Sequence, residues 1–383
     1  MTPWKIPLSE LTFGPEEAEA VQRVLASGWL TMGERTAEFE RALGAALDTQ
    51  PLLAVSSGTA ALHLALTALG VGPGDEVICP SLTFVASANA ALLCGATVVL
   101  ADVLGEDDLG IDPADVAAKI TPRTRAIVIV HYGGYPCDMD ALGAIAAESR
   151  VALVEDAAHA PLGRWRGRAL GTLGDVGCFS FFSNKNLAVG EGGAVWARDE
   201  ALRERMRLLR SHGMTTVTLD RHRGHAFSYD VVAPGMNYRL DELRSALGLV
   251  QLERLAAANA RRRELSTRYH AQLSQIPGLG IPYPSSSARR VGESAHHLLV
   301  VLLPEGSHRE TVMTRMRAQG IQTSIHYPPI HHFSFHGSSE RVRKQGLPRT
   351  EAVASRLLSL PLHPRMRDTD VDEVCGALRA SLR

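Results

Sequence analysis

The stretch GDVGCFSFFSNKNLAVGEGG, residues 174–193, joins a strand-like apolar run to a single lysine. The run Val176–Phe181 has the length and composition of a buried strand. After it Lys185 stands alone, because no other charged residue follows until Glu191, and glycines close the stretch. A solvated lysine does not need such surroundings, whereas a lysine at the bottom of a cleft does. The stretch therefore predicts a buried strand that leads Lys185 into a cleft.

Short apolar runs of the same kind alternate with helical patterns up to about residue 200. With Val176–Phe181, the expected strands are Leu52–Val55, Glu76–Cys79, Thr97–Ala101, Ala126–Val130, Val151–Glu155 and Ala194–Ala197. The expected helices between them are Thr59–Leu69, Val85–Cys94, Pro113–Lys119 and Met139–Ser149. Strands that alternate with helices pair in parallel, and the crossover helices cover the faces of the sheet. The sequence thus predicts an α/β fold with a mostly parallel seven-stranded sheet between helices.

The rest of the chain predicts a smaller C-terminal α+β domain. Residues Leu240–Leu273 have the pattern of one long helix, and His297–Leu303 has that of a strand. Further helical patterns are Arg309–Gln319, Thr350–Leu358 and Thr369–Leu382. We place the large domain at residues 1–250 and the small domain at residues 251–383.

Composition and charge exclude several classes of protein. The chain has 383 residues, of which 45% are hydrophobic, enough to bury a large core and a smaller one. The net charge of -1 offers no basic surplus for nucleic acid. The basic clusters at 203–210 and 261–263 alternate with apolar residues at helical spacing, so we expect them on solvated helix faces.

Targeting signals and cysteine usage point to the cytoplasm. No run of 18 apolar residues occurs, so no membrane span is expected. The start, MTPWKIPLSE, lacks the apolar core of a signal peptide. The five cysteines are scattered and show no CxxC pair, which is typical of free thiols in a cytoplasmic protein.

Lys185 has a chemical explanation if it forms a Schiff base with a carbonyl compound. A lysine amine attacks carbonyl groups only when it is deprotonated, and burial favours the neutral form. A second feature, Ser56-Ser57-Gly58-Thr59, follows the strand Leu52–Val55 and opens a helix. The free N–H groups and positive dipole end of a helix N-terminus suit a phosphate, and glycine permits close approach. An ordinary helix cap is the structural alternative.

Two further residues stand just past strand ends. Asp156 follows Val151–Glu155, at the sheet edge where ligands gather, and its carboxylate can pair with a protonated pyridine nitrogen. Phe84 comes after Glu76–Cys79 and can stack on a flat ring. A turn-forming aspartate and a core phenylalanine are the structural alternatives. Together, in this order on one α/β scaffold, the four features indicate pyridoxal phosphate.

On these residues and the longer stretches around them, the chain resembles the DegT/DnrJ/EryC1/StrS family of fold-type I sugar aminotransferases. The matching stretches are SGWLTMGERTAEFE (27–40), SSGTAALHLAL (56–66), GDEVICPSLTFVASANA (74–90), VEDAAHA (154–160), GDVGCFSFFSNKNLAVGEGG (174–193), GMNYRLDELRSALGLVQLE (235–253) and TSIHYPPIHH (323–332). They extend over nearly the whole chain and identify the family without identifying one member. The segments Pro277–Arg290 and Ser334–Gly346 are not explained by the family pattern.

The resemblance implies pyridoxal phosphate as cofactor and a role for each matching residue. It implies that Lys185 binds the cofactor covalently and moves protons, that Asp156 keeps the pyridine nitrogen protonated, and that Phe84 stacks on the ring. His159 is implied to lie against the ring face or its phenolic oxygen, with a hydrogen-bonded core histidine as the alternative. The implied phosphate-binding residues are Ser57, Gly58, Thr59, Ser180 and, from a neighbouring subunit, Asn237.

The resemblance also implies substrate contacts and a homodimer. The implied substrate-binding residues are Trp29, Thr31, Arg239, His326 and Tyr327. If Asn237 and Arg239 complete the site of a neighbouring subunit, neither active site is whole in a monomer. The alternative is that Asn237 merely caps the helix beginning near Leu240. The histidines of HYPPIHHFSFH (326–336) are irregularly spaced around two prolines, so no metal site is expected.

The implied activity is that of a pyridoxal-phosphate-dependent aminotransferase. The amino group would pass from glutamate or glutamine to a keto group of a nucleotide-linked deoxysugar, in the biosynthesis of an antibiotic or a polysaccharide. A keto-cyclitol is the alternative acceptor, and a non-catalytic cofactor-binding regulator is the alternative class. Dehydratases of the family carry a histidine in place of Lys185, so the lysine favours transamination.

Overall fold

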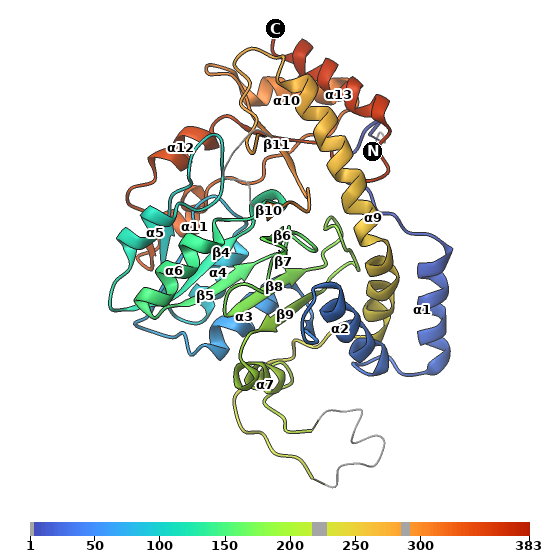
Figure 1. The fold of residues 1–383 in the computed structure, drawn as a ribbon, viewed down its shortest axis with the longest axis vertical. Helices are drawn as coiled ribbons and strands as arrows, with labels where there is room; N and C mark the ends of the chain where they lie inside the picture. The colour runs from blue at the N-terminus through green and yellow to red at the C-terminus, as the bar shows by residue number, and fades with distance from the viewer. Residues whose placement is uncertain (1–3, 217–227, 285–291) are drawn as a thin grey trace.

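The computed structural model describes residues 4–216, 228–284 and 292–383, and its centre is one large mixed sheet (Figure 1). The strands lie in the order β1-β9-β8-β5-β4-β2-β3-β12. Their bounds are Leu53–Val55 (β1), Glu76–Pro80 (β2), Thr97–Ala101 (β3), Thr124–Val130 (β4), Ala152–Asp156 (β5), Val176–Ser180 (β8), Gly193–Ala197 (β9) and Val342–Arg343 (β12). Strand β9 is antiparallel to both of its neighbours, whereas the other adjacent pairs are parallel.

The expected mostly parallel sheet is confirmed, with one strand more than expected. All seven predicted strands belong to it. The eighth, β12, is a two-residue strand that pairs in parallel with β3 at the edge of the sheet. It comes from the segment 334–346, which the family pattern leaves unexplained. A strand of two residues is too short to produce a readable alternation.

Helices cover both faces of the sheet because successive strand residues point to opposite sides. In β4, Ala126 and Val128 pack into one hydrophobic cluster, and Ile127 and Ile129 pack into another. The first cluster contains α3 (Gly58–Ala68), α4 (Ala86–Leu93) and α7 (Glu200–Leu209). The second contains α2 (Glu34–Ala46), α5 (Pro113–Lys119) and α6 (Met139–Ser149).

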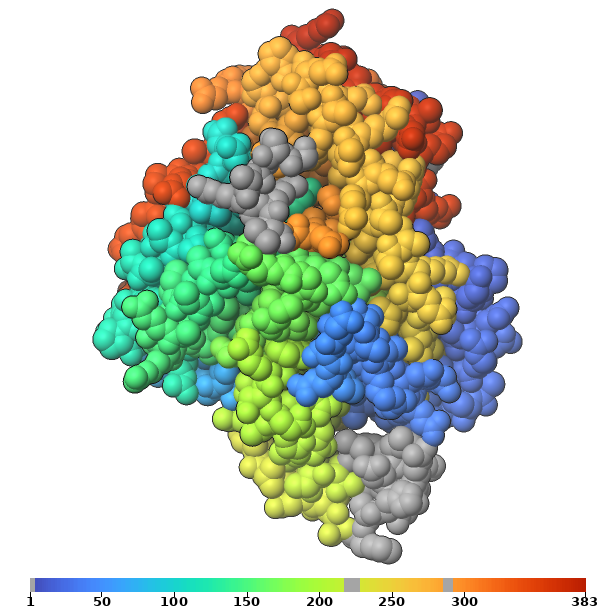
Figure 2. Space-filling model, in the orientation of Figure 1, coloured from blue at the N-terminus to red at the C-terminus, as the bar shows by residue number. Residues whose placement is uncertain are grey.

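The long helix α9 (Glu242–Leu273) connects this sheet to a C-terminal cluster. Its first half packs on α1 (Pro15–Ser27) and α2, and in Figure 2 its golden atoms lie beside the blue N-terminal helices. Its last turns contribute Leu265, Tyr269 and Leu273 to the C-terminal cluster. That cluster also contains α10 (Arg309–Ala318), α13 (Asp368–Ser381) and the antiparallel pair β11 (Leu299–Leu302) and β13 (Leu357–Leu360). The domain boundary placed after residue 250 falls inside α9 and stays a prediction.

Short elements complete the described chain. They are β6 (Arg164–Trp165), β7 (Arg168–Ala169), β10 (Gly292–Glu293), α11 (Ser334–Ser338), α12 (Pro348–Ala354) and the 3-10 helices Tyr132–Gly134 and Ile330–His332. The helix expected at Thr350–Leu358 is wrong in its second half. Helix α12 ends at Ala354, and the fully buried Leu357–Leu360 pairs with β11 instead. Residues 285–290 of the unexplained segment Pro277–Arg290 lie outside the described residues.

Two of the arginines assigned to solvated helix faces are buried, so that expectation is wrong for them. Arg210 is 4% exposed and binds the carboxylate of Glu40 and the carbonyl of Ala54. Arg262 is 6% exposed. The expectation of free thiols is confirmed, since all five cysteines are unpaired. Within the described ranges, no helix combines the length and the apolar character that a membrane crossing requires.

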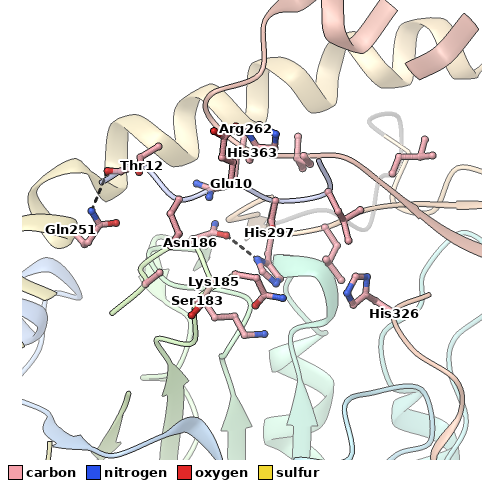
Figure 3. A pocket seen from close by; sticks show the side chains of 18 residues that line it. Glu10, Thr12, Ser183, Lys185, Asn186, Gln251, Arg262, His297, His326 and His363 are labelled. Atoms are coloured by element: carbon pink, nitrogen blue, oxygen red, sulfur yellow. Dashed lines mark hydrogen bonds between the residues drawn. The ribbon is translucent and has the colours of Figure 1, made fainter. Parts of the chain in front are cut away.

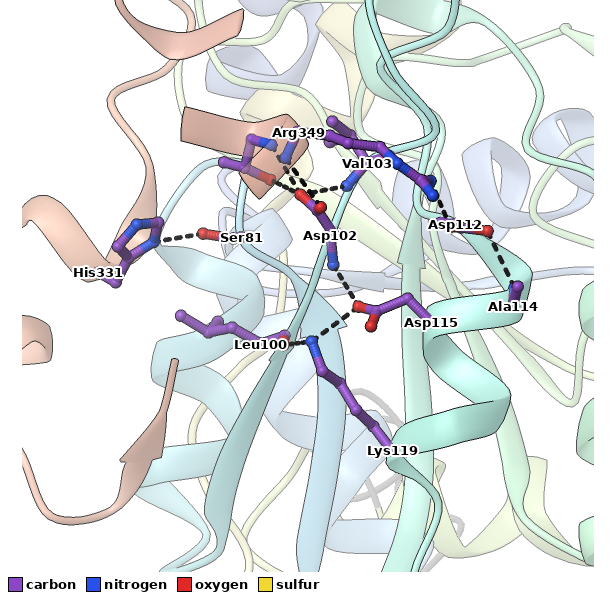
Figure 4. Close-up of polar contacts among 11 residues, drawn as sticks. Ser81, Leu100, Asp102, Val103, Asp112, Ala114, Asp115, Lys119, His331 and Arg349 are labelled. Carbon is purple, nitrogen blue, oxygen red and sulfur yellow. Dashed lines mark hydrogen bonds and ion pairs between the residues drawn. The ribbon is translucent and has the colours of Figure 1, made fainter. Parts of the chain in front are cut away.

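The carboxyl end of β3 is fastened to α12 by a buried aspartate, Asp102 (Figure 4). One carboxylate oxygen accepts hydrogen bonds from the backbone N–H and the hydroxyl of Thr350, both 2.7 Å, and from the N–H of Val103, 3.0 Å. The other accepts from the N–H of Arg349, 3.0 Å. We call this arrangement the Asp102 corner. It satisfies the first N–H groups of α12, which have no partner within the helix.

Candidate active site

A cavity of about 450 Å³ lies at the carboxyl edge of the sheet. Parallel strands in an open α/β sheet gather their ligands at this edge. Ten of the residues singled out in the sequence line it: Ser57, Gly58, Thr59, Phe84, Asp156, His159, Ser180, Lys185, His326 and Tyr327. They come from segments far apart in the chain, so the fold is what brings them together.

Lys185 lies in the loop that follows β8. The loop is held by backbone hydrogen bonds from Lys185 to the carbonyl of Phe182 and from Val189 to that of Phe181. Burial lowers the pKa of Lys185 to about 8, and the charge of Asp156 acts in the opposite direction. A neutral amine is nucleophilic and basic, so the environment prepares this lysine for attack on a carbonyl and for proton transfer.

Asp156 is the last residue of β5 and is 6% exposed. Its carboxylate accepts hydrogen bonds from the Ser87 hydroxyl, 2.8 Å, and from the Ala158 N–H, 3.1 Å. Burial raises the pKa of Asp156, while these hydrogen bonds and the charge of Lys185 oppose the rise. The adjacent Glu155 points to the other face, where His131 and three backbone N–H groups bind it. Of the two adjacent carboxylates, that of Asp156 lines the cavity and that of Glu155 does not.

The N-terminus of α3 forms another wall of the cavity. Ser57 is the N-cap, and its side-chain oxygen accepts from the N–H of Ala60, 3.1 Å. Within the described part of the chain, the N–H groups of Gly58 and Thr59 have no hydrogen-bond acceptor. A Cβ at Gly58 would lie 2.8 Å from that of Ser180, so glycine is required for this close approach. The free donors and the helix dipole make this turn suitable for an anion.

The rings that line the cavity include those of Phe84, His159 and Tyr327. Phe84 is 53% exposed, which rules out the alternative of a core phenylalanine, and its ring centroid is 5.6 Å from that of Tyr327. The Nδ1 atom of His159 accepts from the N–H of Gly133, 3.3 Å, which leaves the ring hydrogen on Nε2, 3.1 Å from the Tyr327 hydroxyl. Burial lowers the pKa of His159 well below its ordinary value, so its ring is neutral.

Four residues singled out in the sequence do not line this cavity. Asn237 is exposed, and Arg239 forms a backbone bridge with Val55. The alternative that Asn237 caps the next helix is wrong, because Asp241 is the N-cap and accepts from the N–H of Arg244, 2.9 Å. Trp29 lines a different hollow, between α1, α2 and α9, and Thr31 follows it by two residues in the chain.

Sequence reasoning missed Ser87 and Asn184. Ser87 donates to Asp156 from the first turn of α4, and Asn184 lines the cavity beside Lys185. Both lie inside stretches quoted for the resemblance, so position in the motif was the available signal. Their chemistry alone gave none, because serine and asparagine are ordinary in helices and loops.

Two of the histidines in 326–336 approach a carboxylate. The Nε2 atom of His331 is 2.5 Å from Glu351, and that of His332 is 3.0 Å from it. The ligand atoms of these three side chains are close enough together to bind a metal ion. Their hydrogen bonds already explain why they lie together. The expectation of no metal stays a prediction.

The residues around the cavity fit pyridoxal phosphate. A lysine amine and a buried carboxylate face one space, and free N–H donors at a helix N-terminus face the same space. These are the groups that an aldehyde, a pyridine nitrogen and a phosphate require. Fold and site together define the chain as an α/β enzyme of the pyridoxal-phosphate-dependent class.

Comparison with known proteins shows which family of that class it is. Residues 12–379 match the model of the DegT/DnrJ/EryC1/StrS aminotransferase family, and the chain belongs to this family. It is 40% identical to the spore coat polysaccharide biosynthesis protein SpsC of Bacillus subtilis (strain 168), over 98% of this chain and 96% of SpsC.

Solved structures agree with this assignment. The aminotransferase TlmJ from Streptoalloteichus hindustanus is 38% identical, with a TM-score of 0.90 over 98% of each chain. The pyridoxal-phosphate form of Spr1654, a candidate sugar aminotransferase from Streptococcus pneumoniae, is 28% identical, with a TM-score of 0.90 over 98% of each chain. The chain is thus a pyridoxal-phosphate-dependent aminotransferase of the sugar aminotransferase family.

Proposed function

We propose that the enzyme moves an amino group from glutamate or glutamine to a keto group of a nucleotide-linked deoxysugar, in two half-reactions. The observation that carries the proposal is the single cavity that contains Lys185, Asp156 and the N-terminus of α3. The name of SpsC refers to polysaccharide biosynthesis, which favours a sugar as the acceptor and polysaccharide biosynthesis as the setting, with antibiotic biosynthesis as the alternative.

In this proposal the first turn of α3 binds the phosphate of the cofactor. The backbone N–H groups of Gly58 and Thr59 donate to it. The hydroxyl of Ser57 accepts from Ala60 and keeps its own hydrogen for the phosphate. Ser180 stands against Gly58 and adds a second hydroxyl. These donors are neutral, but their hydrogen bonds to a doubly charged phosphate are charge-assisted and therefore strong.

Three side chains hold the ring. Asp156 pairs with the pyridine nitrogen and keeps it protonated. The positive charge of this nitrogen in turn stabilises the carboxylate, whose charged form burial disfavours. Phe84 covers one face of the pyridine ring. Because the Phe84 side chain is 53% exposed, its phenyl ring is available for this stacking. His159 has both nitrogens engaged, with Gly133 and Tyr327, so it contacts the ring by its face.

Lys185 moves protons. Pyridoxal phosphate, when bound, supplies an electron sink that lets the carbon beside the transferred nitrogen lose its proton. The Nζ atom of Lys185 takes this proton from the amine-bearing carbon of the donor and returns one to the aminated carbon of the acceptor. Because the pKa of Lys185 is lowered to about 8, neutral amine is available near physiological pH.

A homodimer completes the proposed site. We propose that Asn237 and Arg239 reach the cofactor and substrate of a partner subunit. Asn237 is exposed outside its own cavity, and Tyr229, Val231 and Val232 nearby are 53%, 55% and 54% exposed. An exposed apolar run of this kind is typical of an interaction surface. Trp29, Thr31, His326 and Tyr327 are proposed substrate contacts, the latter two from within the cavity.

We place the enzyme in the cytoplasm, because its five free cysteines favour a reducing compartment.

The alternative functions are weighed by the residues of the cavity and by the chemistry of the acceptor. A non-catalytic regulator is disfavoured because Lys185 and Asp156 are both present in the cavity. A keto-cyclitol requires the same cofactor chemistry, so the acceptor has to be tested directly.

The test is an acceptor screen with the cofactor-loaded enzyme. Glutamate or glutamine is offered with nucleotide-linked 3-keto and 4-keto deoxysugars and with a keto-cyclitol, and amino products are detected by mass spectrometry. We expect an amino sugar from at least one nucleotide-linked acceptor. Amination of the cyclitol alone would replace the acceptor class. An absorption band of bound cofactor that responds to neither donor would support the regulator instead.

A further inference from the structure

A second cavity adjoins the first. It has a volume of about 40 Å³ and shares Asn184, Lys185 and His326 with the larger one. Its other walls come from residues 8–12, from α9 and from residues 360–363. In Figure 3, Arg262 and His363 are drawn at one end and Lys185 at the other, with His297 between them.

Arg262 is a buried cation without an anion. It projects from the middle of α9, is 6% exposed, and makes no hydrogen bond or ion pair to the described residues, with its Nη1 atom fully enclosed. Arg210, buried to the same degree, is bound by Glu40 and Ala54. Burial lowers the pKa of Arg262 to about 10, so the guanidinium remains charged at neutral pH. A buried charge without a partner is strongly unfavourable, which indicates a missing anionic ligand.

The other groups around the small cavity leave its charge positive. Burial lowers the pKa values of His297, His326 and His363, so these imidazoles are neutral. The one carboxylate in the wall, Glu10, is 3.0 Å from the guanidinium of Arg365. Nothing that lines the cavity therefore neutralises Arg262 within the part of the chain that the structure describes.

A chain of hydrogen bonds fixes the ring of His297. Asn259 donates to the carbonyl of Pro161, 2.9 Å, and Asn186 donates to the side-chain oxygen of Asn259, 2.8 Å. The oxygen of Asn186 must then accept from Nδ1 of His297, 2.9 Å. The Nε2 atom of His297 consequently carries a lone pair, and it is buried without a donor among the described residues. The cavity thus offers a buried acceptor as well as a buried cation.

We infer that this small cavity binds the α-carboxylate of the amino donor through Arg262. A guanidinium binds a carboxylate with two parallel hydrogen bonds. A cavity of about 40 Å³ holds roughly three water-sized groups, the size of a carboxylate, since each needs about 10–15 Å³. The rest of the donor then extends past Lys185 into the larger cavity. Its amino group, one carbon from the carboxylate, faces Lys185 and the lone pair of His297. The inference rests on the proposed function and adds the subsite for the donor.

The test measures binding of glutarate to the cofactor-loaded enzyme by calorimetry. Glutarate has the two carboxylates of glutamate and no amino group, so it binds without reacting. For Arg262→Gln we expect the Kd of glutarate to rise at least about tenfold, because charge-assisted hydrogen bonds are lost. The glutamate concentration that half-saturates the donor half-reaction should rise by a similar factor. The matched control is Arg263→Gln, the next arginine on α9, whose side chain is 56% exposed; it should leave both values unchanged.

Stability separates a ligand-binding role from a structural one. Without glutarate, Arg262→Gln should have the same Tm as the parent or a higher one, because an unpaired buried charge is removed. A lowered Tm would mean that Arg262 stabilises the fold, and equal glutarate affinity in parent and variant would overturn the subsite. If chloride raises the Tm of the parent but not of the variant, while glutamate saturation is unchanged, the ligand is a free inorganic anion and the donor assignment is wrong. The glutarate measurement needs no acceptor, so it stands or falls independently of the acceptor screen.

Discussion

Two buried aspartates lie at the carboxyl ends of β3 and β5 in the same sheet, and they differ in the number of hydrogen bonds that they accept. Asp102 is 4% exposed and accepts four hydrogen bonds, three of which attach α12 to the end of β3 (Figure 4). Asp156 is 6% exposed and accepts two, and a cavity takes the place of the others. A saturated carboxylate joins parts of the protein, whereas an incompletely bonded one beside a cavity is available to a ligand.

A lysine accompanies each aspartate and repeats the contrast. Beside the Asp102 corner, Lys119 donates to the carbonyl of Leu100, 2.9 Å, and to Asp115, 2.7 Å, and Asp115 also accepts from the N–H of Asp102, 2.6 Å. In the cavity, the Nζ atom of Lys185 has no hydrogen bond to the described residues, and its pKa is lowered to about 8. The two sites can therefore be compared by matched substitutions.

The largest difference is expected between the two lysines. Lys185→Ala should reduce turnover by at least about 10⁴-fold, because it removes the group that transfers protons. Lys119→Ala should keep turnover and lower the free energy of unfolding by about 1 kcal/mol, the value of a lost hydrogen bond. Steady-state kinetics and urea unfolding measure the two effects. Appreciable turnover in Lys185→Ala would show that another group is the base.

Substitution of Asp156 should mainly lower activity, whereas substitution of Asp102 should mainly lower stability. Asp156→Asn should lower kcat by about 10²–10³-fold with a small change in unfolding free energy, because a charge aimed at the cofactor is lost. Asp102→Asn should leave kcat near that of the parent and lower the unfolding free energy by about 1–3 kcal/mol, since an amide nitrogen cannot accept from the N–H groups of α12. If both variants lose mainly stability, Asp156 has no special relation to the cofactor.

The pKa of the Lys185 amine should be measurable from the pH dependence of the rate at which the enzyme binds the cofactor covalently. Below its pKa the amine is protonated and unreactive, so the rate of covalent cofactor capture should fall about tenfold per pH unit below about 8 and level off above it. Stopped-flow absorbance of cofactor-free enzyme mixed with pyridoxal phosphate measures this rate. A midpoint near 10, the ordinary value for lysine, would contradict the effect of burial.

The smallest expected effects concern the hydroxyls that contact each aspartate. The Ser87 hydroxyl lowers the pKa of Asp156, so Ser87→Ala should raise that pKa. The acidic limb of the pH–rate profile should then move to higher pH, with a few-fold loss of rate at neutral pH. Thr350→Val removes the matching hydroxyl from Asp102 and should cost about 1 kcal/mol of stability without moving that limb. A shift of the same size in both variants would indicate a general structural effect.

The same comparison shows what the sequence could and could not predict. Alternating strands and helices were readable because each pattern is local, and all seven expected strands are in the sheet. Asp156 was singled out by its place after a strand and by its motif. Asp102 also follows a strand, but its partners on α12 are 247 and 248 residues away, so its structural role is invisible locally. The sequence analysis does not predict the helices α1 and α2, because a buried polar residue interrupts the apolar face of each, Glu17 in α1 and Thr36 in α2.

Local sequence failed most clearly for Arg262. Neighbours in a helix point about 100° apart, so three consecutive arginines cannot share one face. Arg261 and Arg263 face outward with carboxylate partners, while Arg262 faces the small cavity. Which arginine turns inward depends on the register of α9 against the rest of the protein. The strand β13 was misjudged for a related reason, since its partner β11 lies far away in the sequence.

The continuity of α9 restricts how substrates enter. Its 32 residues form a rod roughly 48 Å long, and its two halves are embedded in different hydrophobic clusters. Moving these two clusters apart would break backbone hydrogen bonds of α9 near Arg262, which lies in the wall of the small cavity. Widening of the small cavity is therefore expected to involve residues 8–12, which line it and belong to no helix or strand, and not a bend in α9.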